Sequence, residues 1–535
     1  MPVSGGTRAT LDPPKLPRLP PNLFPGVPGH AIIGPMLAKL NTFALLGIDA
    51  VPVEVEVDAS AGLPKTVLVG LPELAVKESI HRIERALANL GYDRPSGRTV
   101  INLAPADLKK DASAFDLPIA MGLLAATGQL LPEQVKEFGI VGELALDGSI
   151  RPVKGALSIA MTAVQRGVTR LLVPTTNAKE AAVVDGVEVY AVDGLAQAVG
   201  ILSGQLQLEP IACDLDALFS RLGSYDVDFA DVRGQEFAKR ALVVAAAGSH
   251  NLIMIGSPGT GKSMLAQRLP TILPPLTLPE SLETTRIYSA LGRLKPDQPL
   301  LATRPFRSPH HTISDAGMAG GGSIPTPGEI SLAHHGVLFL DELPEFSRGS
   351  LEVLRQPLET GNVTISRALN STTFPASFML VAAMNPTPKG DMPAGEVGRR
   401  AMEQYLSRLS GPLLDRIDVH VEAPAVSWNE LSKAPVGTSS ATMRQRVLAA
   451  RLRQLERQGV PNSRLSGKQL DSLAVLDDQS RSMVGNAMTE LGLSARAYDK
   501  IRRVSRTIAD LENNDAIQPQ HVAEAIGYRL LDRRI

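Results

Sequence analysis

The run Gly256-Ser257-Pro258-Gly259-Thr260-Gly261-Lys262-Ser263 constrains the fold of this 535-residue chain more than any other feature. It follows the apolar residues 252–255 and leads through Met264 into a helical segment, which is the strand, glycine loop and helix order of a phosphate loop. Glycines let backbone N–H groups turn toward a phosphate, and the following helix points its N-terminus at the same anion. We therefore expect residues 256–264 to bind ATP, with Lys262 near the β- and γ-phosphates and Ser263 on Mg²⁺. The alternative is an ordinary glycine-rich turn, which requires neither the strand nor the helix.

Two carboxylates follow a second apolar strand pattern at residues 337–340. A buried strand that ends there would deliver Asp341 and Glu342 to a loop at its carboxyl edge. We predict that Asp341 joins Ser263 in the Mg²⁺ shell, and that Glu342 orients or deprotonates the attacking water. An isolated acidic pair is more often a helix cap or a solvent-facing turn, so the phosphate loop upstream carries the catalytic interpretation.

Two further polar residues are candidates for the same site. Asn385 follows a third apolar strand pattern, where its amide would hydrogen-bond to the γ-phosphate or the attacking water; the alternative is a turn asparagine before Pro386. Arg416 is either a surface arginine paired with Asp415 or Asp418, or a finger offered to the γ-phosphate of a neighbouring subunit. The sequence leaves both alternatives open.

Composition excludes several classes of protein. With 54 Lys and Arg against 55 Asp and Glu, the net charge of −1 rules out a wholly basic, histone-like binder, although a basic surface for nucleic acid remains compatible with it. The single cysteine, Cys213, allows no internal disulfide and no cysteine-based zinc site, which fits a reducing cytosol. The apolar runs are too short for a bilayer span. We expect a cytoplasmic protein without a membrane partner.

The chain divides into parts of different character, and 535 residues predict three or four domains. Residues 1–35 carry nine prolines and almost no apolar periodicity, so we expect a disordered leader. The fold class predicted for the rest is α/β and multidomain. After the leader come an α/β domain over 36–204, a polar linker over 205–230, a second α/β domain over 231–425 and a helical part over 426–535, where Leu448, Leu452 and Leu455 fall on one helix face and Ile501, Val504, Ile508 and Leu511 on another.

These motifs in this order resemble the magnesium-chelatase-like AAA+ ATPases, and specifically their ComM (YifB) subgroup. The resemblance covers nearly all of residues 36–535. Besides the phosphate loop, it rests on longer stretches: Arg304 to His311, Gly320 to Gly322, Pro327 to Gly336, Leu340 to Phe346, Ser410 to Arg416 and Arg506 to Leu511.

The resemblance implies a ring, expected to be a hexamer, that uses ATP and Mg²⁺. It implies an N-terminal Lon-protease-like domain, an AAA+ core and a C-terminal helical lid. Members of the ComM subgroup are DNA helicases that drive branch migration in homologous recombination during natural transformation. By the same resemblance Asn385 is the sensor-1 residue, Arg416 the finger and Arg496 the sensor-2 arginine of the lid. DNA would then contact the basic and glycine-rich loops at 304–322 and 363–367.

The sequence departs from the pattern of its relatives at two places. ComM relatives commonly have cysteines just after the sensor asparagine, whereas residues 386–390 here contain none, so we expect no zinc there. In the Lon-like domain, alignment places Ile119 where a Lon protease has its serine and Leu157 where it has its lysine. We predict no peptidase activity, although Ser113 and Lys154 lie nearby in the sequence.

Two other functions compete with the motor. The chain could be the ATPase subunit of a metal chelatase, in which His310-His311 and His334-His335 are ligands in principle. Adjacent histidines without a helical partner or a carboxylate are more often structural. It could also be an ATP-dependent scaffold whose pseudo-protease domain recruits a partner.

Overall fold

The computed structural model describes residues 36–70, 74–106, 113–295, 297–322, 325–366, 371–387, 400, 402, 404–425, 437–529 and 531. The leader predicted at 1–35, the basic residue Arg367 and most of the loop between Thr387 and Arg400 lie outside these residues. Within the described ranges, no helix combines the length and hydrophobicity that a bilayer span requires.

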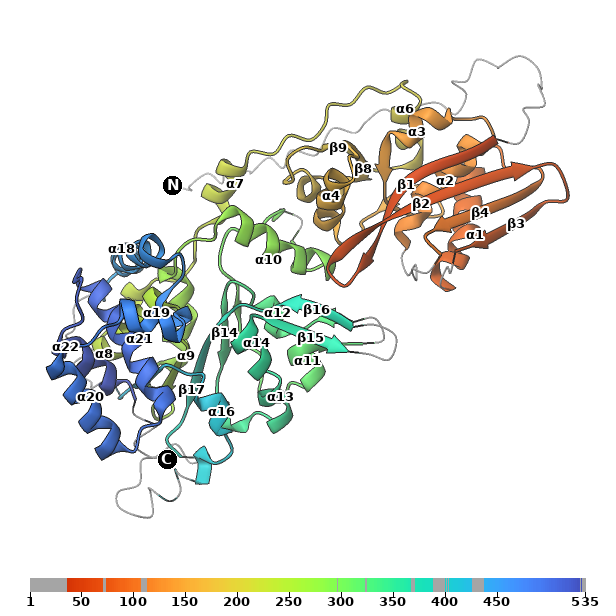
Figure 1. Cartoon of the computed structure of the whole chain (residues 1–535). Coiled ribbons are helices and arrows are strands. Elements are labelled where there is room, and N and C mark those ends of the chain that lie inside the picture. The colour runs from red at the N-terminus through yellow and green to blue at the C-terminus, as the bar shows by residue number, and fades with distance from the viewer. Residues whose placement is uncertain are drawn as a thin grey trace, which may run out of the picture.

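A seven-stranded mixed sheet forms the N-terminal domain (Figure 1). Two of its strands, β1 (Met36–Leu46) and β2 (Asp49–Ser60), form an antiparallel pair. Strand β2 buries Val53, Val55 and Val57 while the glutamates between them stay partly exposed, the alternation that its sequence predicts. Helices α1 (Leu74–Asn89) and α2 (Asp116–Ala126) pack on this core. The strand order is β3 (Lys65–Val69), β4 (Arg98–Ala104), β2 (Asp49–Ser60), β1 (Met36–Leu46), β5 (Phe138–Ile140), β8 (Arg170–Pro174) and β9 (Glu188–Val192).

A five-stranded parallel sheet forms the core of the second domain. Its three inner strands are short apolar runs buried on both faces, so alternate residues enter two separate cores: Met254 faces one and Ile255 the other. Helices α8 (Glu236–Gly248) and α9 (Lys262–Arg268) cover the first face, while α10 (Leu278–Ala290) and α12 (Glu329–Leu332) contribute to the second. The strand order is β11 (Phe306–Arg307), β14 (Val337–Leu340), β17 (Met379–Met384), β10 (Leu252–Ile255) and β18 (Val419–Glu422).

Helices make up the described part of the C-terminal region: α18 (Ser440–Gln458), α19 (Gly467–Leu473), α20 (Asp478–Leu491), α21 (Ala495–Leu511) and α22 (Pro519–Gly527). Helix α21 buries Ile501, Val504 and Ile508 against the first face of the core, as an apolar helix face should. Helix α18 behaves differently. Its three leucines at 448, 452 and 455 do lie on one face, but that face is exposed, and α18 packs through another face, with Met443, Val447 and Ala450.

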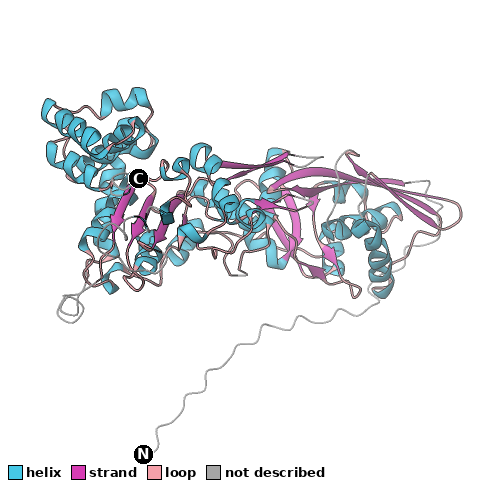
Figure 2. Ribbon diagram, turned by 90° about the horizontal axis from the view of Figure 1, so that it is seen from below, coloured by secondary structure: helices cyan, strands magenta, loops and turns pink. Residues whose placement is uncertain are grey.

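The N-terminal domain and the C-terminal helices lie on opposite sides of the core (Figures 1 and 2). The segment predicted as a linker contains helix α7 (Leu215–Leu222), whose first turn is capped by Asp214. Ser289 on α10 joins the N-terminal domain to the core. Its hydroxyl hydrogen-bonds to the buried Glu180, and its carbonyl accepts from the Gly155 N–H at 3.1 Å.

Candidate active site

The parallel sheet brings three loops to one edge. Strands β14, β17 and β10 are neighbours and run in the same direction, so the residues that follow them meet at their carboxyl ends. These residues are the Asp341-Glu342 pair after β14, Asn385 after β17 and the glycine loop after β10. Lys262 in the glycine loop and Asn385, 123 positions apart in the sequence, are thereby placed side by side.

The loop conformation explains the glycines of the motif. Gly259 and Gly261 have φ values of +78° and +88°, which side chains rarely tolerate. A Cβ on Gly256 would lie 2.3 Å from the Ala423 carbonyl oxygen, so this position requires a residue without one. Ser257, Pro258 and Thr260 complete the turn, and the Thr260 hydroxyl donates to the Ser257 carbonyl at 3.0 Å. Helix α9 begins directly after Gly261 with Lys262 and Ser263, and Met264 behind them is partly exposed.

The Lys262 ammonium group is buried inside this loop. Its Nζ donates to the carbonyl oxygens of Gly256 at 2.6 Å and Ser257 at 2.9 Å, and to Oδ1 of Asn385 at 3.2 Å. Burial lowers the pKa of Lys262, and the negative charges of Asp341 and Glu342 oppose this shift. We predicted separate phosphate contacts for Lys262 and Asn385, and the structure places the two side chains in contact with each other.

The Ser263 hydroxyl donates to Oδ2 of Asp341 at 2.7 Å. A hydroxyl and a carboxylate oxygen are donors of the kind that Mg²⁺ prefers. These two residues thus fit a Mg²⁺ ion that accompanies a nucleotide phosphate, in agreement with the anion-binding geometry of the loop beside them.

Glu342 occupies an unusual backbone conformation, with φ +54°. Non-glycine residues with positive φ are uncommon and concentrate at functional sites. Its N–H donates to Oδ1 of Asp341 at 3.0 Å, and its carboxylate is half exposed, with Oε2 3.3 Å from Nδ1 of His311. The sequence did not predict a role for His311 here. The feature that brings His311 to the site is the short strand β11. It lies parallel to β14, so the residues that follow it reach the same edge of the sheet.

Neither Arg416 nor Arg496 contacts the phosphate loop within the described part of the chain. Arg416 pairs with Glu359, which the sequence did not predict, rather than with Asp415 or Asp418. Asp415 instead pairs with Arg496 at 2.6 Å. The two arginines therefore lie beside each other, on a patch separate from the loop that holds Lys262.

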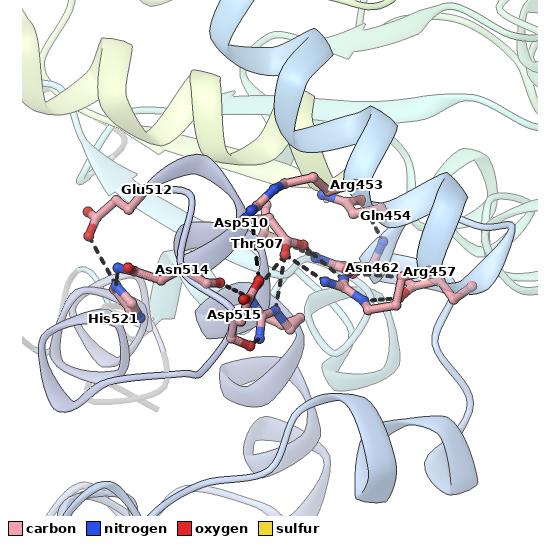
Figure 3. Close-up of polar contacts among 12 residues, drawn as sticks. Arg453, Gln454, Arg457, Asn462, Thr507, Asp510, Glu512, Asn514, Asp515 and His521 are labelled. Carbon is pink, nitrogen blue, oxygen red and sulfur yellow. Dashed lines mark hydrogen bonds and ion pairs between the residues drawn. The ribbon is translucent and has the colours of Figure 1, made fainter.

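Asp418 belongs to a buried polar network between β18 and the C-terminal helices. Burial by itself would raise the pKa of Asp418, but the hydrogen bond with His250 and the positive charge of Lys500 outweigh it and lower the pKa. The other ring nitrogen of His250 lies 2.8 Å from the Thr507 hydroxyl, which also accepts from Asn462 at 3.1 Å. Figure 3 shows how this network continues to Asp510 and Arg457. It fixes the helices to the strand that follows Arg416.

Two arginines at the start of residues 304–322, one of the two loops predicted to contact DNA, are engaged within the chain. Arg304 is largely buried and donates to the carbonyl oxygens of Pro274 and His335 at 2.5 and 2.7 Å, while Arg307 pairs with Glu329 at 2.6 Å. Contact with DNA through the rest of residues 304–322 stays a prediction, whereas these two arginines hold the core together. The physical reason is that carbonyl and carboxylate groups of the same chain already satisfy the guanidinium groups.

Residues 363–366 of the second predicted loop form a strand instead: they belong to β15 (Asn362–Ser366), which pairs with β16 (Ser371–Pro375) in a hairpin. One face of the hairpin packs on the core through Val363, Ile365 and Phe374. The other face is polar and exposed, with cross-strand hydroxyl pairs Thr364 to Thr373 at 3.0 Å and Ser366 to Ser371 at 3.3 Å. This face carries hydroxyl groups that can hydrogen-bond to phosphate oxygens.

The histidine pair at 334 and 335 has a carboxylate partner after all. Glu283 Oε2 lies 3.3 Å from Nε2 of His334 and 3.0 Å from Nε2 of His335, and their ligand atoms are close enough to hold a metal ion. However, Nδ1 of His334 accepts the Ser377 N–H at 2.9 Å. In neutral His334 the proton is therefore on Nε2, which faces Glu283 as a donor and not as a metal ligand.

The N-terminal domain offers no serine and lysine at the aligned positions. Ile119 on α2 and Leu157 on α4 (Ala156–Gln165) are completely buried in its core. The Lys154 side chain lies against Gly292 at the contact with the second domain.

Comparison with known proteins identifies the family. Residues 228–431 match the family described as magnesium chelatase, subunit ChlI; residues 55–177 match subunit ChlI of Mg-chelatase; and residues 437–529 match the ChlI C-terminal family. A magnesium-chelatase 67 kDa subunit of Chlorobaculum parvum is 24% identical over 279 residues, 51% of this chain and 38% of that protein.

Two relatives match over almost their whole length. The chain is 46% identical to the uncharacterized protein YifB of Salmonella typhimurium over 502 residues, which is 93% of this chain and 98% of that protein. It is 45% identical to the competence protein ComM of Haemophilus influenzae over 503 residues, again 93% of this chain and 98% of that protein. The chain therefore belongs to the magnesium-chelatase-like AAA+ family, in the subgroup of ComM and YifB.

Proposed function

We propose that this protein is an ATP-hydrolysing ring motor that translocates on DNA and drives branch migration in homologous recombination during natural transformation. The observation that carries the proposal is the meeting of Lys262, Asn385, Ser263 and Asp341 at one sheet edge, next to Glu342. That edge combines an anion-binding loop, oxygen donors for Mg²⁺ and a carboxylate beside the position of the attacking water. The proposed cofactors are ATP and Mg²⁺.

Each side chain has a role that its surroundings support. The backbone N–H groups of the loop and the Lys262 ammonium group bind phosphate oxygens, and Ser263 and Asp341 hold Mg²⁺, which neutralises charge on the phosphates. Asn385 orients the γ-phosphate or the water. Glu342 takes the proton from that water, and His311, 3.3 Å away, orients the Glu342 carboxylate.

We propose that the site is completed by a second copy of the chain. Arg416 and Arg496 share one patch and make no contact with the phosphate loop within the described residues of their own chain. A finger arginine and a sensor-2 arginine both act by stabilising negative charge on the γ-phosphate, which requires contact with it. Both would reach the nucleotide of the adjoining subunit in a ring, which the family resemblance predicts to be a hexamer.

DNA is the proposed partner, bound through the exposed hydroxyl face of the β15–β16 hairpin. Contacts of this kind are independent of sequence, and they depend on salt where charged groups take part. The relative named for competence supports a role with DNA. The N-terminal domain is proposed to be a Lon-like domain without peptidase activity, because Ile119 and Leu157 provide neither nucleophile nor base. The proposed location is the cytoplasm.

The test is an ATPase assay with and without branched DNA at two salt concentrations. The motor predicts turnover that depends on Lys262 and that DNA stimulates more strongly at low salt. Lack of stimulation at low salt would rule out the translocase. A Glu342→Gln protein that binds ATP without hydrolysing it, yet supports recombination in cells, would favour the scaffold instead.

A further inference from the structure

The proposed finger is held on its own subunit. The Nη2 atom of Arg416 forms an ion pair with Glu359, Nη1 donates to the Pro412 carbonyl oxygen, and Nε is buried without a hydrogen bond among the described residues. Only 16% of the Arg416 side chain is exposed. The guanidinium group is therefore folded against its own chain, although its proposed role needs it to reach another one.

Glu359 is the only carboxylate in direct contact with Arg416 within the described part of the chain, and nearby positive charges make that contact important. Burial lowers the pKa of Arg416 most, the charges of Arg355 and Arg496 lower it further, and the negative charge of Glu352 opposes them. Each of these two arginines has its own carboxylate: Arg355 pairs with Glu352 at 2.8 Å, and Arg496 pairs with Asp415. Glu359 is thus the counter-charge that keeps Arg416 in place within a positive cluster.

Glu359 is also part of the unit that carries the proposed DNA-binding hairpin. It lies on helix α14 (Arg355–Thr360), and β15 begins at Asn362 after a single glycine, Gly361, at φ +72°. The Ala376 N–H after β16 donates to the Gly361 carbonyl at 2.7 Å, and Gln356 on α14 donates to Thr364 on β15 at 3.5 Å. Helix α14 is thus connected to β15 through Gly361 and the Gln356 contact, and the residue after β16 is hydrogen-bonded to Gly361. A displacement of the hairpin therefore moves Glu359.

We propose that Glu359 is a positioning residue that couples the β15–β16 hairpin to the finger Arg416, an inference that rests on the proposed function. When DNA displaces the hairpin, Glu359 moves with it and carries the guanidinium group toward the neighbouring nucleotide. The Glu359 side chain is 60% exposed, so little of the surrounding protein blocks that movement.

The test replaces the carboxylate by an amide of the same shape. In Glu359→Gln, kcat with DNA should fall about tenfold, because a misplaced catalytic group costs rate. The KM for ATP, the affinity for DNA and the melting temperature should stay as in the wild type, since none of these depends on where the finger points. Glu359→Asp, which keeps the charge on a shorter side chain, should recover part of the stimulation.

Glu352→Gln is the matched control. It removes a negative charge that pairs with Arg355 and also acts on Arg416 without touching it, but it leaves the direct contact between Glu359 and Arg416 intact. It should retain the DNA stimulation of the wild type. Wild-type stimulation in Glu359→Gln would overturn the coupling and leave the motor standing, as would a loss explained entirely by weaker DNA binding. A wild-type protein that DNA does not stimulate would overturn the motor, and the coupling with it.

Discussion

The hydroxyl of Ser263 donates a 2.7 Å hydrogen bond to Oδ2 of Asp341, a residue 78 positions further along the chain. One belongs to the first turn of α9 and the other follows β14, and β17 lies between β14 and β10 in the sheet. The two oxygen atoms are thus close enough for one cation to bind both. Such a cation would take the place of the hydrogen bond between them. The geometry of the pair therefore fits the proposed Mg²⁺ site.

The first prediction concerns this pair. In Ser263→Ala one oxygen donor is lost, and the Mg²⁺ concentration that gives half-maximal ATPase activity should rise at least about tenfold. Glu342→Gln should lower kcat by roughly 10²- to 10⁴-fold without changing the Mg²⁺ requirement, because it removes the base and not a ligand. The measurement is ATPase rate against free Mg²⁺ at saturating ATP. An unchanged Mg²⁺ requirement in Ser263→Ala would remove Ser263 from the proposed metal site.

The second prediction concerns ownership of the finger. Lys262→Ala and Arg416→Ala should each lose most of the activity as pure proteins, since each lacks a group that stabilises charge in the transition state. If Arg416 serves a neighbouring subunit, an equal mixture should recover about a quarter of the wild-type rate, because random assembly puts an intact Lys262 beside an intact Arg416 at one site in four. A mixture as inactive as its components would place the finger in its own subunit.

Much of the site could be predicted from sequence because parallel strands deliver their following residues to one edge. The strands at 252–255 and 337–340 begin and end where their apolar residues predict, and so Lys262, Ser263, Asp341 and Asn385 meet. The pairing of Arg416 with Glu359 could not be predicted, because it depends on how a short helix lies against a distant turn.

Surface roles were harder to predict than buried ones. In the sequence, Arg304 and Arg307 suggest a basic surface for DNA. In the structure, carbonyl and carboxylate groups from other segments of the chain bind their guanidinium groups. The leucines of α18 show the same limit, since periodicity identifies a helix face without saying which face is covered. Tertiary packing decides both questions.

The third prediction concerns the network that fixes the C-terminal helices. Asp510 is buried and accepts from Arg457 at 2.7 Å, Asn462 at 2.8 Å and Arg506 at 3.0 Å (Figure 3). Asp510→Asn leaves two arginines without their counter-charge, so the free energy of unfolding should fall by about 3–5 kcal/mol. Urea unfolding followed by far-UV circular dichroism measures this.

Asp478 provides the contrast for that experiment. It also pairs with an arginine of its own region, Arg481 at 3.1 Å, but both side chains are largely exposed. Exposed ion pairs of this kind contribute little to the free energy of unfolding, so the Asp478→Asn protein should unfold at the same urea concentration as the wild type. Equal effects of the two substitutions would show that burial of Asp510 does not make its ion pairs important.

The fourth prediction concerns pH and rests on His420, on strand β18. His420 is completely buried, and its Nδ1 accepts the Leu531 N–H at 3.2 Å, which requires the neutral ring. Burial lowers the pKa of His420 well below its ordinary value, the charges of Arg529 and Lys500 lower it further, and Asp418 opposes them. Burial lowers the pKa of His334 as well, so both rings act in the same direction.

The sign follows from proton binding. Below the unfolded pKa of about 6.5 the unfolded chain takes up protons that folded His420 does not, so stability falls as pH drops from 6.5 toward 5, by up to about 1.4 kcal/mol per pH unit for each such histidine. His420→Gln keeps an acceptor for the Leu531 N–H and cannot titrate, so its urea midpoint should change less between pH 7.5 and 5.5 than that of the wild type. The comparison must be made within this range, because carboxylates with lowered pKa, such as Asp418, lose their contribution only at more acidic pH. Identical pH profiles for the two proteins would mean that His420 binds protons equally in the folded and the unfolded chain, which would contradict a lowered pKa in the fold.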